Sequence, residues 1–218
     1  MIVKYLIIAV ISYFLGSFNF SIILSKTLEK RDIRESGSGN AGATNMLRTY
    51  GKHLAMLTML GDILKVALAI WIAFMILDAP MNMIFKIVDD VETAETIILH
   101  KEFAGFFCVL GHIFPLYFKF KGGKGVSTCA GMVILVDWRI ALILFVIFVI
   151  TIAVSKMISL GSVIIAILYP VLIAVFYKDL VLILIAVLFA SIVIIAHRQN
   201  IKRIFNGTEN KLSSKKSK

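Results

Sequence analysis

The sequence predicts an all-α integral membrane protein, a polytopic bundle of about seven transmembrane helices. Sixty per cent of the 218 residues are hydrophobic and the mean hydropathy is +0.94, which exceeds what soluble domains show. Seven apolar segments follow one another, and the most basic connections can all lie on one side of the membrane, as the positive-inside rule requires. We expect one membrane-embedded domain over residues 1–210, followed by a basic, disordered tail over residues 211–218.

Three apolar segments fill the first half of the chain. Residues 5–25 carry no charge, and no small-residue cleavage site precedes the charged stretch that follows, so they predict a span and not a removable signal peptide. Residues 53–77 are long enough to cross a membrane, and residues 103–118 form the third segment. Pro115 should end that helix, because its ring cannot continue the hydrogen-bond ladder.

The second half contains four further apolar segments, at residues 126–136, 140–155, 157–177 and 180–196. The polar break at residues 137–139 favours a hairpin of two helices, because one continuous helix would place the basic loop 119–124 and the basic tail on opposite sides of the membrane. The eleven residues of the first limb rise only about 17 Å as a helix, so this limb is short or tilted. A hairpin that dips into the membrane without crossing it satisfies the same charge pattern.

Lysine and arginine set the expected orientation. Segments 26–52, 119–124 and 198–218 are rich in these residues, whereas the loop 78–101 is acidic. We therefore expect the basic segments to be cytoplasmic, the acidic loop to be external, the N-terminus outside and the C-terminus in the cytoplasm. The net charge of +10 follows from this distribution and indicates no nucleic-acid partner, while the basic tail is expected to meet anionic membrane lipids.

The first polar constellation is residues 36–48, SGSGNAGATNMLR. Its glycines match G-x-G-x-x-G, but a dinucleotide fold needs a preceding strand, and here a transmembrane segment and a charged stretch come before it. A glycine turn that leads into a helix presents backbone N–H groups to an anion. The candidate phosphate-binding residues are Gly37, Ser38, Gly39, Asn40, Gly42, Thr44, Asn45 and Arg48. The alternative is a capped surface turn.

The second constellation is residues 111–128, GHIFPLYFKFKGGKGVST. It is not a Walker A loop, because the residue after Lys124 is glycine and not Ser or Thr. Lysines around a glycine pair nevertheless provide positive charge and close backbone approach, which suit a phosphate. The candidates are Lys121, Gly122, Gly123, Lys124, Gly125 and Thr128. The alternative is an ordinary basic loop that anchors the topology.

The third constellation is residues 197–209, HRQNIKRIFNGTE. His197 and Asn200 are three residues apart and would share one face of a helix. Further candidates in this segment are Arg198, Gly207 and Glu209. For His197 the alternative is an interfacial histidine that caps the last span.

Two charges, Asp62 and Lys65, lie inside the second apolar segment and three residues apart, on one helix face. An intramembrane charge indicates function by default, and the alternative is an ion pair that holds the helix in the bundle. His112 is expected to be a hydrogen-bonded core residue. No metal site is predicted, because the four histidines are scattered and no Cys/His spacing matches a zinc pattern. The motifs G-x-S-x-G and H-x-x-x-x-D are also missing from the sequence.

The three constellations together resemble the bacterial acyl-phosphate:glycerol-3-phosphate acyltransferases, the PlsY family, and the resemblance covers roughly residues 5–209. The chain departs from the family at Ala41, where a larger aliphatic residue is common, and at Gln199, where Glu is common. The resemblance implies transfer of a fatty acyl group from acyl phosphate to the sn-1 hydroxyl of glycerol 3-phosphate, giving lysophosphatidic acid and inorganic phosphate for phospholipid biosynthesis. It implies no cofactor, and a functional link to an acyltransferase that produces acyl phosphate.

Roles for the candidate residues follow from the resemblance. An acyl phosphate is already activated, so direct attack without a covalent acyl-enzyme needs positioning and charge neutralisation more than a nucleophile. The implied catalytic residues are Ser38, Lys124, His197 and Asn200, with Lys121 and Arg48 on phosphate oxygens. On a looser match, Ser162 or Ser159 lines the acyl-phosphate pocket. His197 is one candidate general base, and an oxygen of the acyl phosphate is the other and the favoured proton acceptor.

Two rival functions remain at this stage. A transporter of an organic phosphate would show broken helices near the membrane midplane, whereas the polar residues here gather at the cytoplasmic ends and only Pro170 interrupts a span centrally. A scaffold for other lipid enzymes would need none of the polar constellations for activity.

Overall fold

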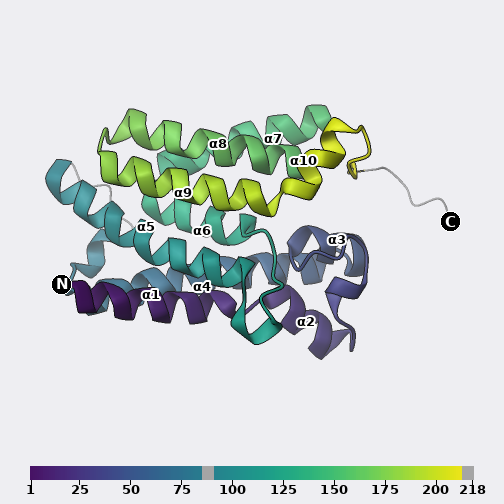
Figure 1. Cartoon of the computed structure of the whole chain (residues 1–218), viewed down its shortest axis with the longest axis horizontal. Coiled ribbons are helices and arrows are strands. Elements are labelled where there is room, and N and C mark those ends of the chain that lie inside the picture. The colour runs from purple at the N-terminus through teal and green to yellow at the C-terminus, as the bar shows by residue number, and fades with distance from the viewer. Residues whose placement is uncertain (85–90, 213–218) are drawn as a thin grey trace. The chain divides into compact units, whose positions relative to one another are not determined.

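The computed structural model describes residues 1–84 and 91–212. Within them every regular element is helical (Figure 1), which confirms the all-α fold class. The chain divides into two compact units, Met1–Trp138 and Arg139–Lys218. The first contains α1 (Ile2–Ser17), α2 (Phe20–Leu28), η1 (Ile33–Glu35), α3 (Ala43–Tyr50), α4 (Lys52–Leu77), η2 (Met81–Met83), α5 (Val91–Ile113), η3 (Leu116–Phe118) and α6 (Val126–Val136). From the boundary onward come α7 (Trp138–Ser155), α8 (Ile158–Phe176), α9 (Leu180–Ala196) and α10 (Arg198–Phe205).

Five segments of the described chain are long and apolar enough to cross a membrane: Ile2–Leu28, Lys52–Leu77, Glu92–Phe118, Trp138–Ser155 and Ile158–Phe176. A sixth is the pair α9 and α10, if the two helices are counted as one span that bends by 63°. The predicted multi-span character is therefore confirmed. The remaining apolar helix, α6, is shorter than these spans, so a count of seven requires α6 to cross as well.

Helix α5 begins earlier than the sequence predicted. It starts at Val91 and not near residue 103, so the second half of the loop expected over 78–101 is helical. Ala94, Ile97 and Ile98 recur at helical spacing and are buried, which gives this charged stretch an apolar face. Residues 85–90, which include two of the acidic residues of that loop, lie outside the described residues.

The first span contains a break between α1 and α2. Phe18 is extended, and the side chain of Asn19 accepts a hydrogen bond of 3.2 Å from the backbone N–H of Ile22. An asparagine in this position caps a new helix and satisfies one of its unpaired N–H groups. The chain therefore restarts as α2 inside the apolar segment, and the carbonyl groups before the break need other partners.

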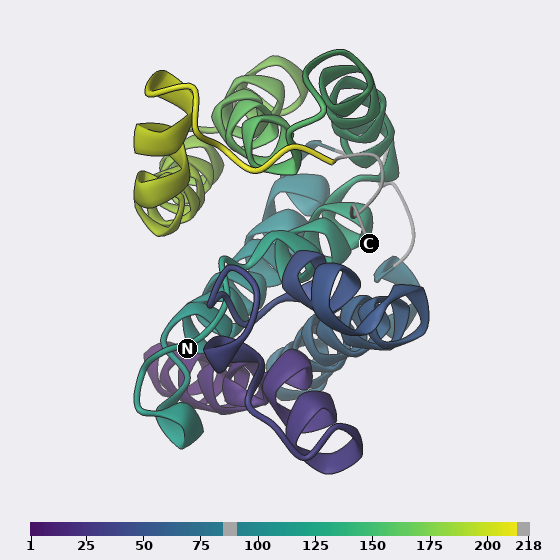
Figure 2. The ribbon, with the colours of Figure 1, turned by 90° about the vertical axis from the view of Figure 1, so that its right-hand side faces the viewer.

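In the second unit α8 and α9 lie side by side (Figure 2), with the rings of Tyr169 and Phe189 edge to face at 6.4 Å between centroids. Asp179 caps α9 by accepting a hydrogen bond of 2.8 Å from the backbone N–H of Leu182. The backbone N–H of Leu212 donates to the carbonyl of Lys156, so the start of the tail predicted as disordered is attached to this unit. Residues 213–218 of that tail lie outside the described residues.

Candidate active site

The glycine turn before α3 is organised by Asn45. Its Nδ2 donates to the carbonyls of Ile33 and Ser36 at 3.1 and 2.9 Å, and its Oδ1 accepts from the backbone N–H of Ser38 at 2.9 Å. Gly37 has a φ of +59°, and a Cβ there would collide with the Asn45 side chain. Asn45 was predicted to orient substrate, but its side-chain amide is used to shape the turn.

The other predicted residues of this segment differ in exposure. Gly37, Ser38 and Gly39 are exposed, and Asn40, Gly42, Thr44 and Arg48 are half-buried. The N–H groups of Gly39 and Gly42 donate within the turn, to the carbonyls of Ser36 and Asn40. Ser38 is therefore exposed on a turn whose backbone is fixed by its own hydrogen bonds and by the Asn45 side chain.

Gly122 and Gly123 pack closely against the end of α5. The N–H of Gly122 donates to the carbonyl of Ile113 at 3.1 Å, and that of Gly123 donates to the carbonyl of His112 at 3.2 Å. A Cβ on Gly123 would collide with the carbonyl of Ala41 and with the His112 ring. We expected this glycine pair to bring the backbone close to a phosphate, but the last carbonyls of α5 already accept hydrogen bonds from both N–H groups. The glycines instead bring the second loop against the first.

The remaining residues of the second loop lead into α6. Gly125 precedes that helix with a φ of +80°, a conformation that suits glycine. Of the two lysines of the predicted phosphate loop, Lys121 is exposed and Lys124 is half-buried. Thr128 is buried, and within the described chain its hydroxyl has no hydrogen-bond partner.

Asp62, Lys65 and His112 form a buried cluster. The ammonium of Lys65 is 2.8 Å from Asp62 Oδ1 and 2.8 Å from His112 Nδ1. It also donates to the carbonyls of Gly16 and Phe18, at 3.0 Å each. These are carbonyls that the break between α1 and α2 leaves without helical partners. This geometry fits the alternative of an ion pair that holds the helix in the bundle, because the cluster joins the broken first span to α4 and α5.

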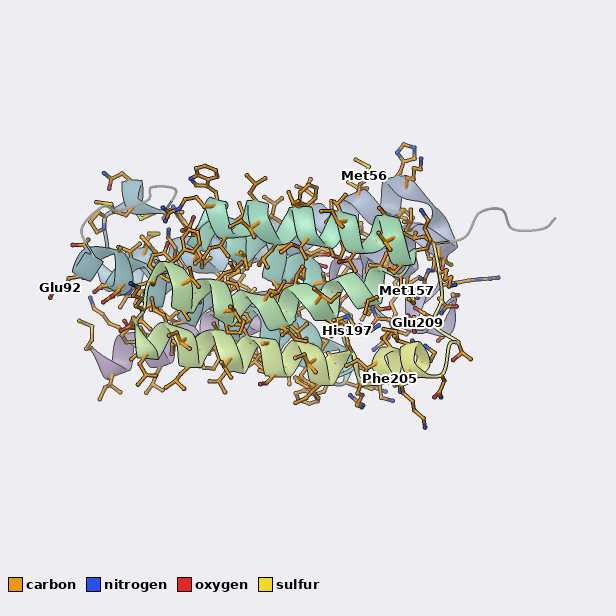
Figure 3. All side chains as sticks on the ribbon, turned by 90° about the horizontal axis from the view of Figure 1, so that it is seen from above. Met56, Glu92, Met157, His197, Phe205 and Glu209 are labelled. Atoms are coloured by element: carbon orange, nitrogen blue, oxygen red, sulfur yellow. The ribbon has the colours of Figure 1, made fainter. Side chains whose placement is uncertain are left out.

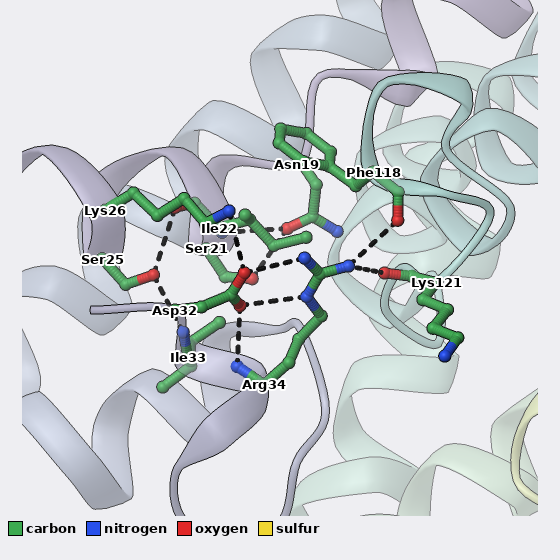
Figure 4. A network of polar contacts seen from close by, with 10 residues as sticks. All are labelled: Asn19, Ser21, Ile22, Ser25, Lys26, Asp32, Ile33, Arg34, Phe118 and Lys121. Atoms are coloured by element: carbon green, nitrogen blue, oxygen red, sulfur yellow. Dashed lines mark hydrogen bonds and ion pairs between the residues drawn. The ribbon is translucent and has the colours of Figure 1, made fainter. Parts of the chain in front are cut away.

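Asp32 and Arg34 were not among the predicted site residues, yet Arg34 connects the two loops (Figure 4). Its Nε and Nη2 donate to the two carboxylate oxygens of Asp32 at 2.9 and 2.7 Å. Its Nη1 donates to the carbonyls of Phe118 and Lys121, at 3.0 Å each. Lys26 adds an ion pair of 3.0 Å to Asp32. The hydrogen bond from Arg34 holds the pKa of Asp32 well below its usual range, in spite of partial burial.

In the second unit the predicted residues gather where α9 passes into α10 (Figure 3). His197 is 2% exposed and lies at the bend, and its Nδ1 is 2.8 Å from the carbonyl of Val193. A carbonyl only accepts, so Nδ1 carries a proton and the neutral ring has its acceptor at Nε2. Arg198 is exposed and donates to the carbonyl of Ile195.

Glu209 was predicted to bind substrate, but it is buried and accepts hydrogen bonds from three side chains. Asn200 Nδ2, Ser159 Oγ and Arg203 Nε donate to its carboxylate at 2.7, 2.8 and 2.8 Å. Burial raises the pKa of Glu209, but these three donors outweigh it and leave the pKa below its usual value. Of the two serines considered for the acyl-phosphate pocket, Ser159 donates to this cluster, while the Ser162 hydroxyl donates to the carbonyl of Ile158 in its own helix.

A family model described as glycerol-3-phosphate acyltransferase matches residues 6–207. The chain is 37% identical over 206 residues to the glycerol-3-phosphate acyltransferase of Syntrophomonas wolfei, covering 94% of this chain and 96% of that protein. It is 36% identical over 219 residues to the Clostridioides difficile protein of the same name, covering 99% and 98%.

Two crystal structures of PlsY, described as an integral membrane glycerol 3-phosphate acyltransferase, are also similar. The glycerol 3-phosphate form matches with a TM-score of 0.79 and 31% identity, covering 96% of each chain. The lysophosphatidic acid form matches with a TM-score of 0.77 and 30% identity, covering 96% of this chain and 95% of that one.

Proposed function

Because the chain belongs to the glycerol-3-phosphate acyltransferase family, we propose that it moves a fatty acyl group from an acyl phosphate to the sn-1 hydroxyl of glycerol 3-phosphate. One observation supports glycerol 3-phosphate as the acyl acceptor. The related PlsY structures are a glycerol 3-phosphate form and a lysophosphatidic acid form, and these two ligands differ by one acyl group. The basic loops support an acyl phosphate as the acyl donor, because Lys121, Lys124 and Arg48 can bind the phosphate that leaves.

The reaction needs no covalent intermediate on the protein. The glycerol hydroxyl oxygen bonds to the acyl carbon, the bond from that carbon to the phosphate oxygen breaks, and phosphate leaves with the electron pair. Lysines and hydrogen-bond donors that hold the phosphate lower the barrier by neutralising the charge on the leaving group. In this proposal Lys121, Lys124 and Arg48 neutralise phosphate, and Ser38, Asn40 and Thr44 add hydrogen bonds to it.

His197 and Asn200 are proposed to bind the glycerol hydroxyls. The bond from His197 Nδ1 to the carbonyl of Val193 places the proton of the neutral ring on Nδ1, so Nε2 is the ring nitrogen that can accept a proton. Glu209 accepts a hydrogen bond from the NH₂ group of Asn200, which fixes the orientation of the Asn200 amide. The proton of the attacking hydroxyl ends either on His197 or, as we favour, on an oxygen of the departing phosphate.

The setting of the reaction is part of the proposal. The protein is a multi-pass membrane protein, and we propose that it lies in the bacterial cell membrane with the basic loops and the C-terminus in the cytoplasm. We further propose one membrane-embedded domain over residues 1–210 and a functional link to an acyltransferase that supplies the acyl phosphate.

An assay of the purified protein in lipid tests the donor. Labelled glycerol 3-phosphate is supplied with palmitoyl phosphate or with palmitoyl-CoA, and lysophosphatidic acid is measured. Product from the acyl phosphate alone is expected, and product from the CoA ester alone would overturn the donor assignment. Lys124→Ala should lower the rate, and Lys52→Ala, an exposed lysine outside the two loops, is the matched control. Uptake of glycerol 3-phosphate into proteoliposomes without an acyl donor would favour a transporter instead.

A further inference from the structure

Arg34 is held in one orientation by Asp32. The guanidinium forms a two-bond fork with the carboxylate, and the Asp32 and Arg34 side chains are only 9% and 24% exposed. Asp32 is fixed in turn, because it caps η1 by accepting the backbone N–H of Arg34 and pairs with Lys26 at the end of α2. A planar fork of this kind leaves the guanidinium little freedom to rotate.

The remaining nitrogen, Nη1, donates hydrogen bonds to the backbone of the second loop. It donates to the carbonyls of Phe118 and Lys121, which lie 84 and 87 residues further along the chain. Figure 4 shows the carbonyl of Lys121 directed at the guanidinium and its side-chain amine on the opposite side. Arg34 therefore fixes the backbone of Lys121 and leaves the ammonium to point elsewhere.

The loop between these two carbonyls needs an anchor. Lys119 and Phe120 both have positive φ, at 58° and 57°, a conformation that side-chain-bearing residues adopt at an energetic cost. At its base the loop is held by Gly122 and Gly123 on the last carbonyls of α5. Phe120 and Lys121 also donate within the loop, to the carbonyls of Pro115 and Phe118, and Arg34 adds two bonds from outside it. Removing the guanidinium should therefore loosen the segment that carries Lys121.

We propose that Arg34 is a positioning residue, which aligns Lys121 with the glycine turn at residues 36–42. This inference rests on the proposed function, in which Lys121 binds a phosphate group. Four of the five guanidinium N–H groups of Arg34 donate to Asp32 or to the second loop, so we infer that Arg34 acts by holding the backbone of Lys121.

The test compares Arg34→Gln and Arg34→Lys with Arg31→Gln, which removes the same charge from an exposed arginine three residues away. KM for palmitoyl phosphate, KM for glycerol 3-phosphate and kcat are measured for each. Amide hydrogen exchange of residues 116–125 is followed in the same samples without substrate. If Arg34→Gln does not fold, Arg34→Lys decides, because it keeps the charge.

Both Arg34 variants should raise KM for one phosphate substrate by about 10- to 100-fold, with a smaller change in kcat, because a displacement of the order of 1 Å is enough for this. Exchange over residues 116–125 should quicken. Lysine should not rescue, since one ammonium cannot make both the fork and the two carbonyl bonds. Arg31→Gln should match the wild type.

Unchanged KM values, or full rescue by lysine, would overturn the proposal. A raised KM with unchanged exchange would also overturn it, since Arg34 would then bind substrate itself. If the wild-type protein makes no product from palmitoyl phosphate, the proposed function fails, and the exchange experiment still decides whether Arg34 anchors the loop.

Discussion

Asn200 and Glu209 are joined by a hydrogen bond of 2.7 Å from Nδ2 to Oε1. A carboxylate only accepts, so the NH₂ group of Asn200 must face Glu209 and the amide oxygen must point elsewhere. Gly207 makes this possible, because its φ of +69° turns the chain after α10 and brings residue 209 back toward that helix. Glu209 therefore fixes the orientation of the Asn200 amide.

Replacing Glu209 with glutamine should uncouple Asn200 and weaken the fold. A glutamine keeps the shape, but it loses the negative charge, and a hydrogen bond to a charged group contributes about 1.5–3 kcal/mol. We expect a lower unfolding midpoint and a KM for glycerol 3-phosphate raised by roughly tenfold, measured in detergent and in the acyl-transfer assay. Glu29→Gln, at an exposed site, is the control. Wild-type kinetics and stability in Glu209→Gln would rule out this role.

The same carboxylate predicts how stability changes with pH. Because the folded-state pKa of Glu209 is lowered, the carboxylate contributes stability above its unfolded pKa of about 4.3, and this contribution is lost as the pH falls through the folded-state pKa. The unfolding midpoints of the wild type and Glu209→Gln should differ most near neutral pH and converge on acidification. A difference that stays constant down to about pH 3 would contradict the lowered pKa.

Length and hydrophobicity were enough to predict a multi-span helical protein, but not where polar side chains replace backbone partners. The break at Phe18 and Asn19 lies in an apolar run, and only the distant Lys65 accounts for its carbonyls. The early start of α5 was missed because Lys101 and Glu102 resemble loop residues, yet both are buried. Hydropathy averages over a segment and does not register pairing between segments far apart in sequence.

The candidate site shows the same limit. Glycines and lysines identified both loops of the first unit, because close approach and positive charge are visible in sequence. The sequence did not show which polar groups face a ligand. Asn45 and Glu209 were predicted to contact substrate, but their side chains form hydrogen bonds within the protein. Arg34 was hidden among the basic residues of segment 26–52, all of which the positive-inside rule already explained.

In the intramembrane cluster, removing the charge of Lys65 should destabilise the fold more than removing the charge of Asp62. Lys65→Met leaves a buried carboxylate without its partner and also leaves the carbonyls of Gly16 and Phe18 without a donor. Asp62→Asn leaves Lys65 bonded to both carbonyls. Removing one partner of a buried pair costs roughly 3–5 kcal/mol, so we expect Lys65→Met to lower the unfolding midpoint strongly and Asp62→Asn to lower it less.

Thermal unfolding in detergent measures this order, and Leu64→Met, at an exposed position of α4, is the control. Because the cluster supports the fold, each variant that still folds should keep most of its activity per mole of folded protein even where its unfolding midpoint is lower. A greater loss of stability in Asp62→Asn than in Lys65→Met would show that the carbonyl contacts of Lys65 matter little.

Gly123→Ala tests whether the second loop must lie directly against the first. The new methyl group would collide with the backbone carbonyl of Ala41 and with the His112 ring, and neither is the end of a flexible chain. The two loops must then separate, and a misplacement of the order of 1 Å can cost about 100-fold in rate. Gly42→Ala is the comparison, because its φ of −167° suits any residue and its Cβ would meet only the tip of the Asn40 side chain, at 3.1 Å. Acyl-transfer rates should fall much further in Gly123→Ala than in Gly42→Ala. Equal rates in the two variants would mean that the close contact between Gly123 and Ala41 is not needed for catalysis.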